Sequence, residues 1–449
     1  MAAARPLTAV ERILARTSGA ASVQPGDIVV CAADRAILLE TLFMPNSLNW
    51  RDPLVVPAPE RALVVFDHAV PAPSAAEAGA MTRARAFCER FGVEVVDVGG
   101  HGISHQIVAE RGLARPGELL LCSDSHTCAS GAFNCAARGV GGLEMLQVVC
   151  TGGTWFVVQP TIRVELSGAL PAGCEGKDAF LALAARFGSA DNCNLEFTGP
   201  GVATLSLHDR RTIATQCAEV NAEFVLFPYD DVVRDALAAL GVHEGAGPGG
   251  FTPAVADPGA EYAATWALDL STVVPQVATP GAVVGNVVAA ADAGDVHLDQ
   301  CFVGSCANGH LEDFAVAAAL LRGRHVAAGT RLIVTPASQQ VYLDAVRAGY
   351  VTEIMEAGGV VTPSTCGACF GYHMGVLGDG ETCLTASTRN FKGRMGSPDS
   401  RVWLGSTRTV VASAIAGRIV DPRTADAAAA GGAAAAGASA AAGPEARVA

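Results

Sequence analysis

The feature that most constrains the fold is an alternation of two kinds of segment along most of the chain. Short runs rich in β-branched and other apolar residues predict strands, at 62–66, 93–98, 118–121, 161–166, 331–334 and 360–362. An amphipathic pattern and longer Ala-rich stretches predict helices between them, at 5–25, 74–91 and 131–149. Strands that alternate with helices favour an α/β architecture.

Two stretches rich in Pro and Gly divide the chain into candidate domains. One lies at 157–160, and the other runs from about 245 to 285, through "GAGPGGFTPAVADPG" and "ATPGAVVG". They predict α/β domains at 1–157, 158–285 and 286–423. The remaining segment, 424–449, has 15 Ala among its 26 residues and too few large apolar side chains to bury, which predicts a disordered tail.

Charge and hydrophobicity exclude several classes of protein. The net charge of −14, from 30 basic and 44 acidic residues, argues against a general nucleic-acid binder. The chain has no uninterrupted apolar run of about 18 residues, so we expect no membrane-spanning helix. Its N-terminus lacks the apolar core of a secretory signal, and we therefore expect a cytoplasmic protein. An anionic small molecule is not excluded, because a pocket needs only a few local arginines.

Three of the 14 cysteines stand in unusual surroundings. Cys306 lies in "FVGSCANGHLEDF", where an apolar run passes into a helical pattern, and Cys366 and Cys369 form a Cys-x2-Cys pair in "PSTCGACFG". Free backbone N–H groups at a strand-to-helix junction stabilise a thiolate, the form of cysteine that binds metal. The irregular spacing in a long chain fits a disulfide framework poorly, and we expect the other eleven cysteines to be small core residues.

The Cys-x2-Cys pair alone leaves a zinc site, a redox pair, an iron–sulfur site and coincidence open. A zinc site would normally need a second Cys-x2-Cys or a His pair at matching spacing, which the sequence does not contain. A thioredoxin-like pair belongs at the first strand–helix turn of a small domain. Three thiolates without a fourth partner fit an iron–sulfur cluster with one iron left open to substrate.

Three short polar segments interrupt apolar sequence, and each places a His after a strand-like run. They are "VVFDHAVP" with Asp67 and His68, "GISHQI" with His105, and "LLCSDSHTCASGAF" with Asp124, Ser125 and His126. A carboxylate beside an imidazole can tune it for acid–base catalysis near neutral pH. Taken singly, each His is better explained by a structural hydrogen bond. Three segments of similar design in one chain favour a catalytic site.

A further polar segment, "TRNFKGRMG", places Arg389 and Arg394 close together near the C-terminal end. The planar guanidinium group binds carboxylates through two hydrogen bonds. Standing alone, this segment would be interpreted as a solvated loop.

Taken together, four of these segments resemble the motifs of the aconitase superfamily, in the same order along the chain. They are "SDSHTCASGAF", "GSCANGHLED", "TCGACFG" and "TRNFKGRMG". The similarity runs from about Leu7 to Pro422 and is greatest to the large subunits of 3-isopropylmalate dehydratases and homoaconitases. It implies three α/β domains around one 4Fe–4S cluster, whose open fourth iron would bind the substrate hydroxyl and a carboxylate. Cys306, Cys366 and Cys369 would hold this cluster.

The resemblance also implies roles for the polar residues. The acid–histidine pairs Asp67–His68, His105–Asp124 and His126–Glu219 would handle the leaving hydroxide and orient water. Ser125, Arg389 and Arg394 would contact the substrate or the surroundings of the cluster. The implied enzyme is a hydro-lyase that isomerises a hydroxy di- or tricarboxylic acid by dehydration and rehydration, of the isopropylmalate type that serves leucine biosynthesis.

The implied enzyme needs a partner. Family members use a swivelling fourth domain with a Ser-Ser-Arg loop, whose Ser removes the carbon-bound proton. The segment "LGSTRTV" at 404–410 looks superficially similar but aligns with a packing segment of the large subunit. We therefore expect the swivelling domain to be a separate small subunit, without which this chain turns over little or nothing.

Four departures from the family pattern leave alternatives open. Leu39-Glu40 stands where His-Asp or Gln-Asp is usual, which implies the loss of a polar substrate contact. Thr215 stands for an Asn near the cluster, Ala307 for a Thr and Thr388 for an Asn. These changes favour, as an alternative, a specialised-metabolism paralogue acting on an unusual malate or maleate derivative. A non-catalytic cluster-binding protein and a zinc protein that retains the fold are further alternatives.

Overall fold

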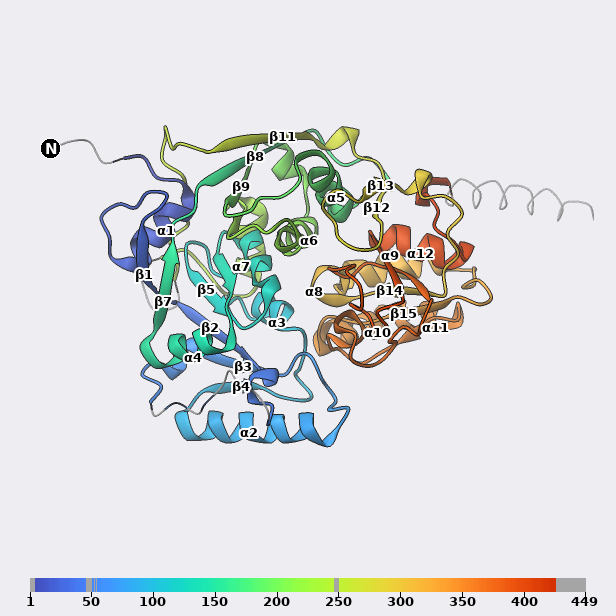
Figure 1. Ribbon diagram of the computed structural model, residues 1–449, viewed down its shortest axis with the longest axis horizontal. Helices are drawn as coiled ribbons and strands as arrows, with labels where there is room; N and C mark the ends of the chain where they lie inside the picture. Colours follow the sequence, from blue (N-terminus) through green and yellow to red (C-terminus); the bar gives the residue numbers. More distant parts are fainter. Residues whose placement is uncertain (1–4, 46–50, 52, 54, 246–249, 425–449) are drawn as a thin grey trace, which may run out of the picture.

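The structure is a computed structural model that describes residues 5–45, 51, 53, 55–245 and 250–424 (Figure 1). Within these residues the strands form three larger sheets and one two-stranded ribbon. The predicted tail lies outside the described residues except for Thr424. No helix in the described ranges is long and apolar enough to cross a membrane.

The first sheet has the order β4-β3-β2-β5-β6, and its paired strands are all parallel. Its strands are β2 (Arg35–Leu39), β3 (Ala62–Val65), β4 (Glu94–Val96), β5 (Leu119–Cys122) and β6 (Ala136–Gly139). The helices of this part of the chain are α1 (Ala9–Ser18), α2 (Ala75–Phe91), α3 (Ser104–Glu110), the 3-10 helix η3 (Ser125–Phe133) and α4 (Gly142–Thr151). β1 (Ile28–Ala32) and β7 (Gly153–Val157) pair with each other as a separate antiparallel ribbon.

The second sheet has the order β10-β9-β8-β11 and is also parallel. Its strands are β8 (Thr161–Ser167), β9 (Asn194–Thr198), β10 (Val225–Leu226) and β11 (Ala264–Asp269). The helices along it are α5 (Gly176–Phe187), α6 (Leu207–Gln216), the short η5 (Cys217–Val220) and α7 (Asp231–Ala239). One apolar core spans this sheet and one face of the first sheet, which fixes the two against each other.

The third sheet has the order β13-β12-β18-β17-β14-β15-β16. Its strands are β12 (Gln276–Ala278), β13 (Val287–Ala289), β14 (Gln300–Val303), β15 (Arg331–Val334), β16 (Val360–Val361), β17 (Thr382–Thr385) and β18 (Arg401–Gly405). It is parallel from β18 to β16, and β12 runs antiparallel to both of its neighbours. The helices are α8 (Ser305–Asn308), α9 (Leu311–Leu321), α10 (Gln339–Arg347), α11 (Tyr350–Glu356) and α12 (Thr407–Ala416). The predicted α/β fold class is confirmed.

Two predicted helices differ from the observed elements. The first helix covers only Ala9–Ser18, because Thr8 and Glu11 form a capping box at its start and Gly19, in the left-handed conformation, ends it. The helix predicted at 131–149 is wrong in its first half, where β6 extends the sheet beside β5. Pairing with β5 outweighs the helical preference of the Ala-rich segment.

The second predicted seam, 245–285, contains two strands that belong to different sheets. β11 pairs with β8 in the second sheet, whereas β12 pairs with β13 and β18 in the third. The chain therefore crosses from one sheet to the other between residues 269 and 276. The domain boundaries themselves stay a prediction.

The three sheets surround a central meeting point. In Figure 1 the third sheet and its helices, in orange and red, lie beside the first sheet in blue and cyan, and the second sheet in green lies above both. The short helix α8 contacts α3, α6 and η3, and α5 contacts β12 and β13, so both helices join the third sheet to its neighbours. Loops that leave the carboxyl ends of the strands can converge here.

Candidate active site

The predicted site residues line one pocket with a volume of about 300 Å³. All of them except Glu219 lie in its wall: Asp67, His68, His105, Asp124, Ser125, His126, Cys306, Cys366, Cys369, Arg389 and Arg394. Glu219 meets the pocket through His126 and Arg389, whose side chains it contacts. The pocket thus collects side chains from segments up to about 330 positions apart in the chain, between 67 and 394.

Parallel strands bring these side chains together. Asp67 and His68 follow β3, and Asp124 to His126 follow β5, so both groups lie at the same edge of the first sheet. Cys306 follows β14, and the Arg389 segment follows β17. The site therefore lies between the carboxyl-end loops of the first and third sheets.

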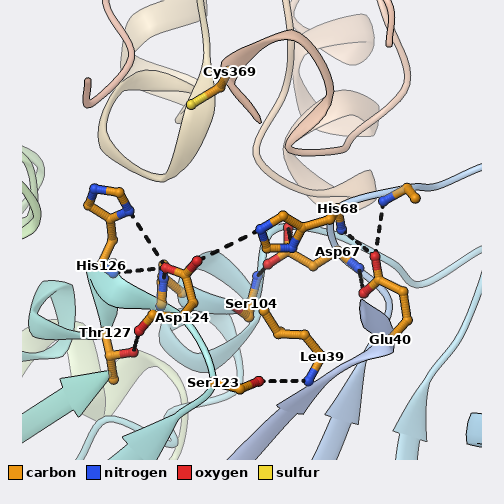
Figure 2. A network of polar contacts seen from close by, with 12 residues as sticks. Leu39, Glu40, Asp67, His68, Ser104, Ser123, Asp124, His126, Thr127 and Cys369 are labelled. Carbon is orange, nitrogen blue, oxygen red and sulfur yellow. Dashed lines mark hydrogen bonds and ion pairs between the residues drawn. The ribbon is translucent and has the colours of Figure 1, made fainter. Parts of the chain in front are cut away.

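Asp124 is the centre of the acid–histidine contacts (Figure 2). Its Oδ1 atom lies 2.7 Å from His105 Nε2 and accepts a hydrogen bond of 2.8 Å from the backbone N–H of His126. Its Oδ2 atom lies 3.7 Å from His68 Nε2. Asp124 thus contacts three histidine residues, whereas the family resemblance pairs it only with His105.

The two other pairs lie on either side of Asp124. His126 Nε2 lies 3.1 Å from Glu219 Oε1, and Glu219 also accepts a hydrogen bond of 2.7 Å from Arg389 Nε. His68 Nδ1 lies 3.6 Å from Asp67 Oδ1. The structure therefore brings each predicted acid and histidine together, and the catalytic roles of these residues stay a prediction.

The carboxylates of the site keep its histidines ready to carry a proton. Burial opposes the charged form of His68, but Asp67, Glu40 and Asp124 outweigh it and raise the pKa of this imidazole. Burial also opposes the charged form of His126, whose pKa is raised by its hydrogen bonds to Asp124 and Glu219. Conversely, burial works against ionisation of Asp124, yet the contacts with His105 and His126 hold the pKa of this carboxyl well below its usual value.

Glu40 supports the site without lining the pocket. Its buried carboxylate accepts hydrogen bonds from the backbone N–H groups of Asp67, His68 and Ala69, at 2.9, 2.6 and 3.0 Å (Figure 2). This carboxylate fixes the loop that carries the first acid–histidine pair. Sequence reasoning noted Glu40 only as a departure from the family pattern, and the one available signal was an isolated acid directly after an apolar run.

The three cysteines are buried and lie in the same wall of the pocket. Ser305, at φ 75°, starts the turn that aims Cys306 inward, and the backbone N–H of Cys366 donates to the carbonyl of Asp67 at 3.2 Å. Arg394 Nη2 donates to Cys369 Sγ at 3.6 Å. A hydrogen bond with Cys366, together with this guanidinium, lowers the pKa of the Cys369 thiol well below its usual value.

The donor set fits an iron–sulfur cluster. Three buried thiols face one cavity, a cation lies against one of the sulfur atoms, and acids, histidines and arginines contribute to the cavity wall. Several buried atoms of the wall also have no hydrogen-bond partner among the described residues: Asp67 Oδ1, His68 Nδ1, Thr388 Oγ1 and Arg394 Nε. A buried polar group without a partner costs about 1–3 kcal/mol, and a polar group bound in the pocket could satisfy these four.

The departures from the family pattern take different places. Leu39 and Thr388 line the pocket, so they lie where a substrate or cofactor can meet them. Thr215 instead donates its hydroxyl hydrogen bond to the Arg211 carbonyl at 2.7 Å, and Ala307 is buried with its carbonyl accepting from Thr212 at 2.9 Å.

The other cysteines pack away from the pocket. Eight of them are buried, which confirms their interpretation as core residues: Cys31, Cys88, Cys122, Cys128, Cys135, Cys217, Cys301 and Cys383. The remaining three, Cys150, Cys174 and Cys193, are half-buried. All fourteen are free of disulfide bonds within the described part of the chain.

Comparison with known proteins adds independent information. Residues 56–292 and 282–417 match the sequence model of the aconitase family (aconitate hydratase). The chain is 53% identical over 418 residues to the 3-isopropylmalate dehydratase large subunit of Mycolicibacterium smegmatis, which covers 93% of this chain and 97% of that protein.

Two further relatives cover 93% of this chain and 99% of their own length. One is the 3-isopropylmalate dehydratase large subunit 1 of Methanopyrus kandleri, 39% identical over 421 residues. The other is the 2,3-dimethylmalate dehydratase large subunit of Eubacterium barkeri, 37% identical over 422 residues.

Proposed function

The chain belongs to the aconitase family, and from this premise we propose that it is the large, cluster-bearing subunit of a hydro-lyase of the 3-isopropylmalate dehydratase type. Such an enzyme isomerises a hydroxy di- or tricarboxylic acid by removing water and adding it back. The observation that carries the proposal is the pocket itself, where three buried thiols face three acid–histidine pairs and two arginines.

Membership of the family implies an iron–sulfur cluster. We assign Cys306, Cys366 and Cys369 as the residues that hold it, as one 4Fe–4S cluster with an iron that has no protein ligand. Such an iron, when bound, supplies a Lewis acid that weakens the carbon–oxygen bond of the substrate hydroxyl. The cation at Cys369 and the unpartnered polar atoms of the wall support this assignment.

The chain's own residues bind the substrate and move protons. Arg389 and Arg394 supply the positive charge that a polycarboxylate needs, which explains how a chain of net charge −14 can bind an anion. His68, whose pKa is raised, lies with Nε2 towards Asp124 and Nδ1 towards Asp67, and its protonated form is the candidate donor of a proton to a leaving hydroxide. The Asp124–His105 contact keeps the carboxylate ionised for this task.

A second chain completes the proposed enzyme. The relatives are named large subunits, and this chain spans 97% of the length of the one from M. smegmatis. The "LGSTRTV" segment is part of the packed interior: Ser406 is buried with its hydroxyl 2.9 Å from that of Thr409, and Thr407 Oγ1 donates to Asp313 at 2.5 Å. This segment cannot serve as a mobile Ser-Ser-Arg loop, so we propose that the small subunit carries that loop.

A second candidate substrate is an unusual malate or maleate derivative. Leu39 is compatible with it, because an aliphatic side chain in the pocket wall suits any substrate with an alkyl group at that position, 3-isopropylmalate included. The similarity to a 2,3-dimethylmalate dehydratase large subunit also supports a substituted malate as the substrate.

A bound metal ion in place of the cluster is the competing interpretation of the site. Ligand atoms of Asp67, His68 and Cys366 lie within 4.8 Å of one another, a spacing that a single ion can bridge. That arrangement leaves Cys306 and Cys369 without a role, and it is therefore the weaker of the two.

The test is anaerobic reconstitution with iron and sulfide, followed by addition of the small subunit and an assay on 3-isopropylmalate, 2,3-dimethylmalate and homocitrate. We expect the broad visible absorption of thiolate-ligated iron, and turnover of at least one acid only when both chains are present. A loaded complex that turns over none of them would overturn the enzymatic proposal. Purified protein that holds zinc and has no affinity for iron would overturn the assignment of the cluster.

A further inference from the structure

A lysine is buried completely beside the candidate active site. Lys177, on α5, has no exposed surface, and its ammonium donates hydrogen bonds to the backbone carbonyls of Ala386 and Ser387, the second at 2.7 Å. None of the described residues forms an ion pair with it. A buried charge without a counter-charge is strongly unfavourable, and here burial lowers the pKa of Lys177 to about 8. Such a residue needs an explanation.

The two carbonyls belong to the loop that carries part of the pocket wall. Ala386 and Ser387 follow β17 and directly precede Thr388 and Arg389, which line the pocket. Lys177 lies on α5, which packs along the second sheet. Its hydrogen bonds therefore join this loop of the third sheet to the second-sheet region. Gln216 on α6 reaches the same Ser387 carbonyl at 3.5 Å, but with a neutral side chain.

The groups whose negative charge acts on Lys177 include two of the three site cysteines. In order of strength they are the carboxylate of Asp313, the sulfur atoms of Cys306 and Cys369 in their ionised form, and the carboxylate of Glu175. A cluster held by three thiolates concentrates negative charge at this place. A loaded site would add this charge to that of the Asp313 carboxylate, which already acts on the ammonium.

We propose that Lys177 is a positioning residue of the cluster site: it fastens the Ala386–Ser387 backbone that carries Thr388 and Arg389, and its buried positive charge compensates the charge of the cluster. The inference rests on the proposed function, because it requires the cluster. A positive charge near a cluster stabilises its reduced, more negative state and so raises its reduction potential.

The test compares K177M, K177R and Q216L after anaerobic reconstitution. K177M removes the charge at similar size, K177R keeps the charge, and Q216L removes a neutral contact to the same Ser387 carbonyl. We expect K177M to shift the reduction potential of the cluster to more negative values and to speed the loss of iron to a chelator by about tenfold. We expect K177R and Q216L to stay close to the unsubstituted protein in potential.

The outcomes separate this inference from the proposed function. A wild-type chain that takes up no cluster would overturn the proposed function and, with it, the proposed role of Lys177. A wild-type cluster with an unchanged potential and unchanged iron loss in folded K177M overturns only the role of Lys177. An equal shift in Q216L shows that the loop, not the charge, sets the potential, and also overturns it. If K177M does not fold, K177Q, which keeps a donor for the two carbonyls, replaces it as the neutral variant.

Discussion

Two groups of buried and partly buried acids and histidines differ in what their polar atoms contact. The pocket group consists of His68, His105, His126, Asp124 and Glu219. The inner group consists of His208, His310 and Asp313, and its atoms are occupied by protein. His208 Nδ1 lies 2.8 Å from His310 Nδ1, and His310 Nε2 lies 3.1 Å from the Cys306 carbonyl.

The inner group is also saturated at its carboxylate. Asp313 accepts hydrogen bonds from the His310 backbone N–H at 3.0 Å, from Asn308 Nδ2 at 3.0 Å and from Thr407 Oγ1 at 2.5 Å. Burial and the nearby charge of Arg211 lower the pKa of His310 well below its usual value, so this imidazole is neutral. His208 differs from His310: burial opposes its charged form, but Asp313 and neighbouring carboxylates outweigh burial and raise its pKa, as carboxylates do for His68 and His126 in the pocket group.

Residue type therefore does not distinguish a catalytic group from a structural one. Both groups are largely withdrawn from solvent and both combine imidazole with carboxylate, and the inner group is compact enough to suggest a metal site. The two groups differ in their surroundings. The pocket group faces a cavity with unpartnered atoms in its wall, whereas the polar atoms of the inner group form hydrogen bonds that hold α8 and Cys306 in place.

The largest expected effect is loss of turnover from a change in the pocket group. E219Q keeps the size of the side chain but removes the charge that supports the proton on His126. We expect kcat per loaded cluster to fall about 10³-fold, or about 4 kcal/mol, with the free energy of unfolding changed by less than about 1 kcal/mol. Steady-state kinetics of the two-chain enzyme and denaturant unfolding measure the two quantities. Unchanged kcat would remove Glu219 from the catalytic group.

The matched change in the inner group should act on stability instead. D313N is equally conservative in size, but it replaces one acceptor oxygen by an amide N–H2 donor, which faces donors that have no other partner. We expect the free energy of unfolding to fall by about 3 kcal/mol and kcat per loaded cluster to fall less than tenfold. If D313N lost turnover as severely as E219Q while unfolding normally, the distinction between the two groups would fail.

Much of the pocket group could be predicted from sequence, for a physical reason. Polar residues that directly follow strand-like runs must meet at the carboxyl edge of a parallel sheet, which places Asp67, His68 and Asp124 together. The grouping of Cys306 with Cys366 and the pairing of Glu219 with His126 came from the family resemblance. No local sequence pattern links the members of either set.

What could not be predicted depends on contacts between distant segments. Lys177 reaches Ala386 across 209 positions, and Glu40 holds the backbone of His68 across 28. Neither contact leaves a periodic signature in the sequence. The helix expected at 131–149 failed for the same reason, since pairing of β6 with β5 decides its first half.

A buried acid far from the pocket provides a further contrast in stability. Glu196 is satisfied by the Val10 backbone N–H at 2.9 Å and by Tyr262 at 3.0 Å, yet burial raises its pKa to about 6. Because the folded pKa lies above the ordinary value of 4.5, the folded state favours the protonated form. Its stabilising contribution is complete below about pH 4.5 and is lost as the pH rises through about 6, for a total of about 2 kcal/mol.

The variant E196Q isolates this effect, since other groups titrate equally in both proteins. Relative to E196Q, the wild-type free energy of unfolding should decrease as the pH rises over that window, while kcat of the two proteins stays equal. Denaturant unfolding between pH 4 and pH 8 measures the difference. A difference that does not vary with pH, or that grows in favour of the wild type, would show that Glu196 ionises freely in the fold.

The smallest expected effect concerns selectivity in the pocket wall. L39Q places an amide where the structure has an aliphatic group, and it should shift the ratio of kcat/KM between an alkyl-substituted malate and homocitrate by about tenfold towards homocitrate. L39I, which keeps the wall apolar, is the control and should preserve the ratio. An equal shift in both variants would indicate a packing defect and not a lost polar contact.

The assignment of the three cluster cysteines is tested most directly by iron and sulfide analysis after anaerobic reconstitution. The proteins to compare are the unsubstituted chain, C306S, C366S, C369S and C128S, in which Cys128 is a buried cysteine of η3 outside the pocket wall. We expect the unsubstituted chain and C128S to hold the iron and sulfide of a 4Fe–4S cluster, and each of the other three to lose most of it. Full iron content and an unchanged visible spectrum in C306S, C366S or C369S would contradict the assignment.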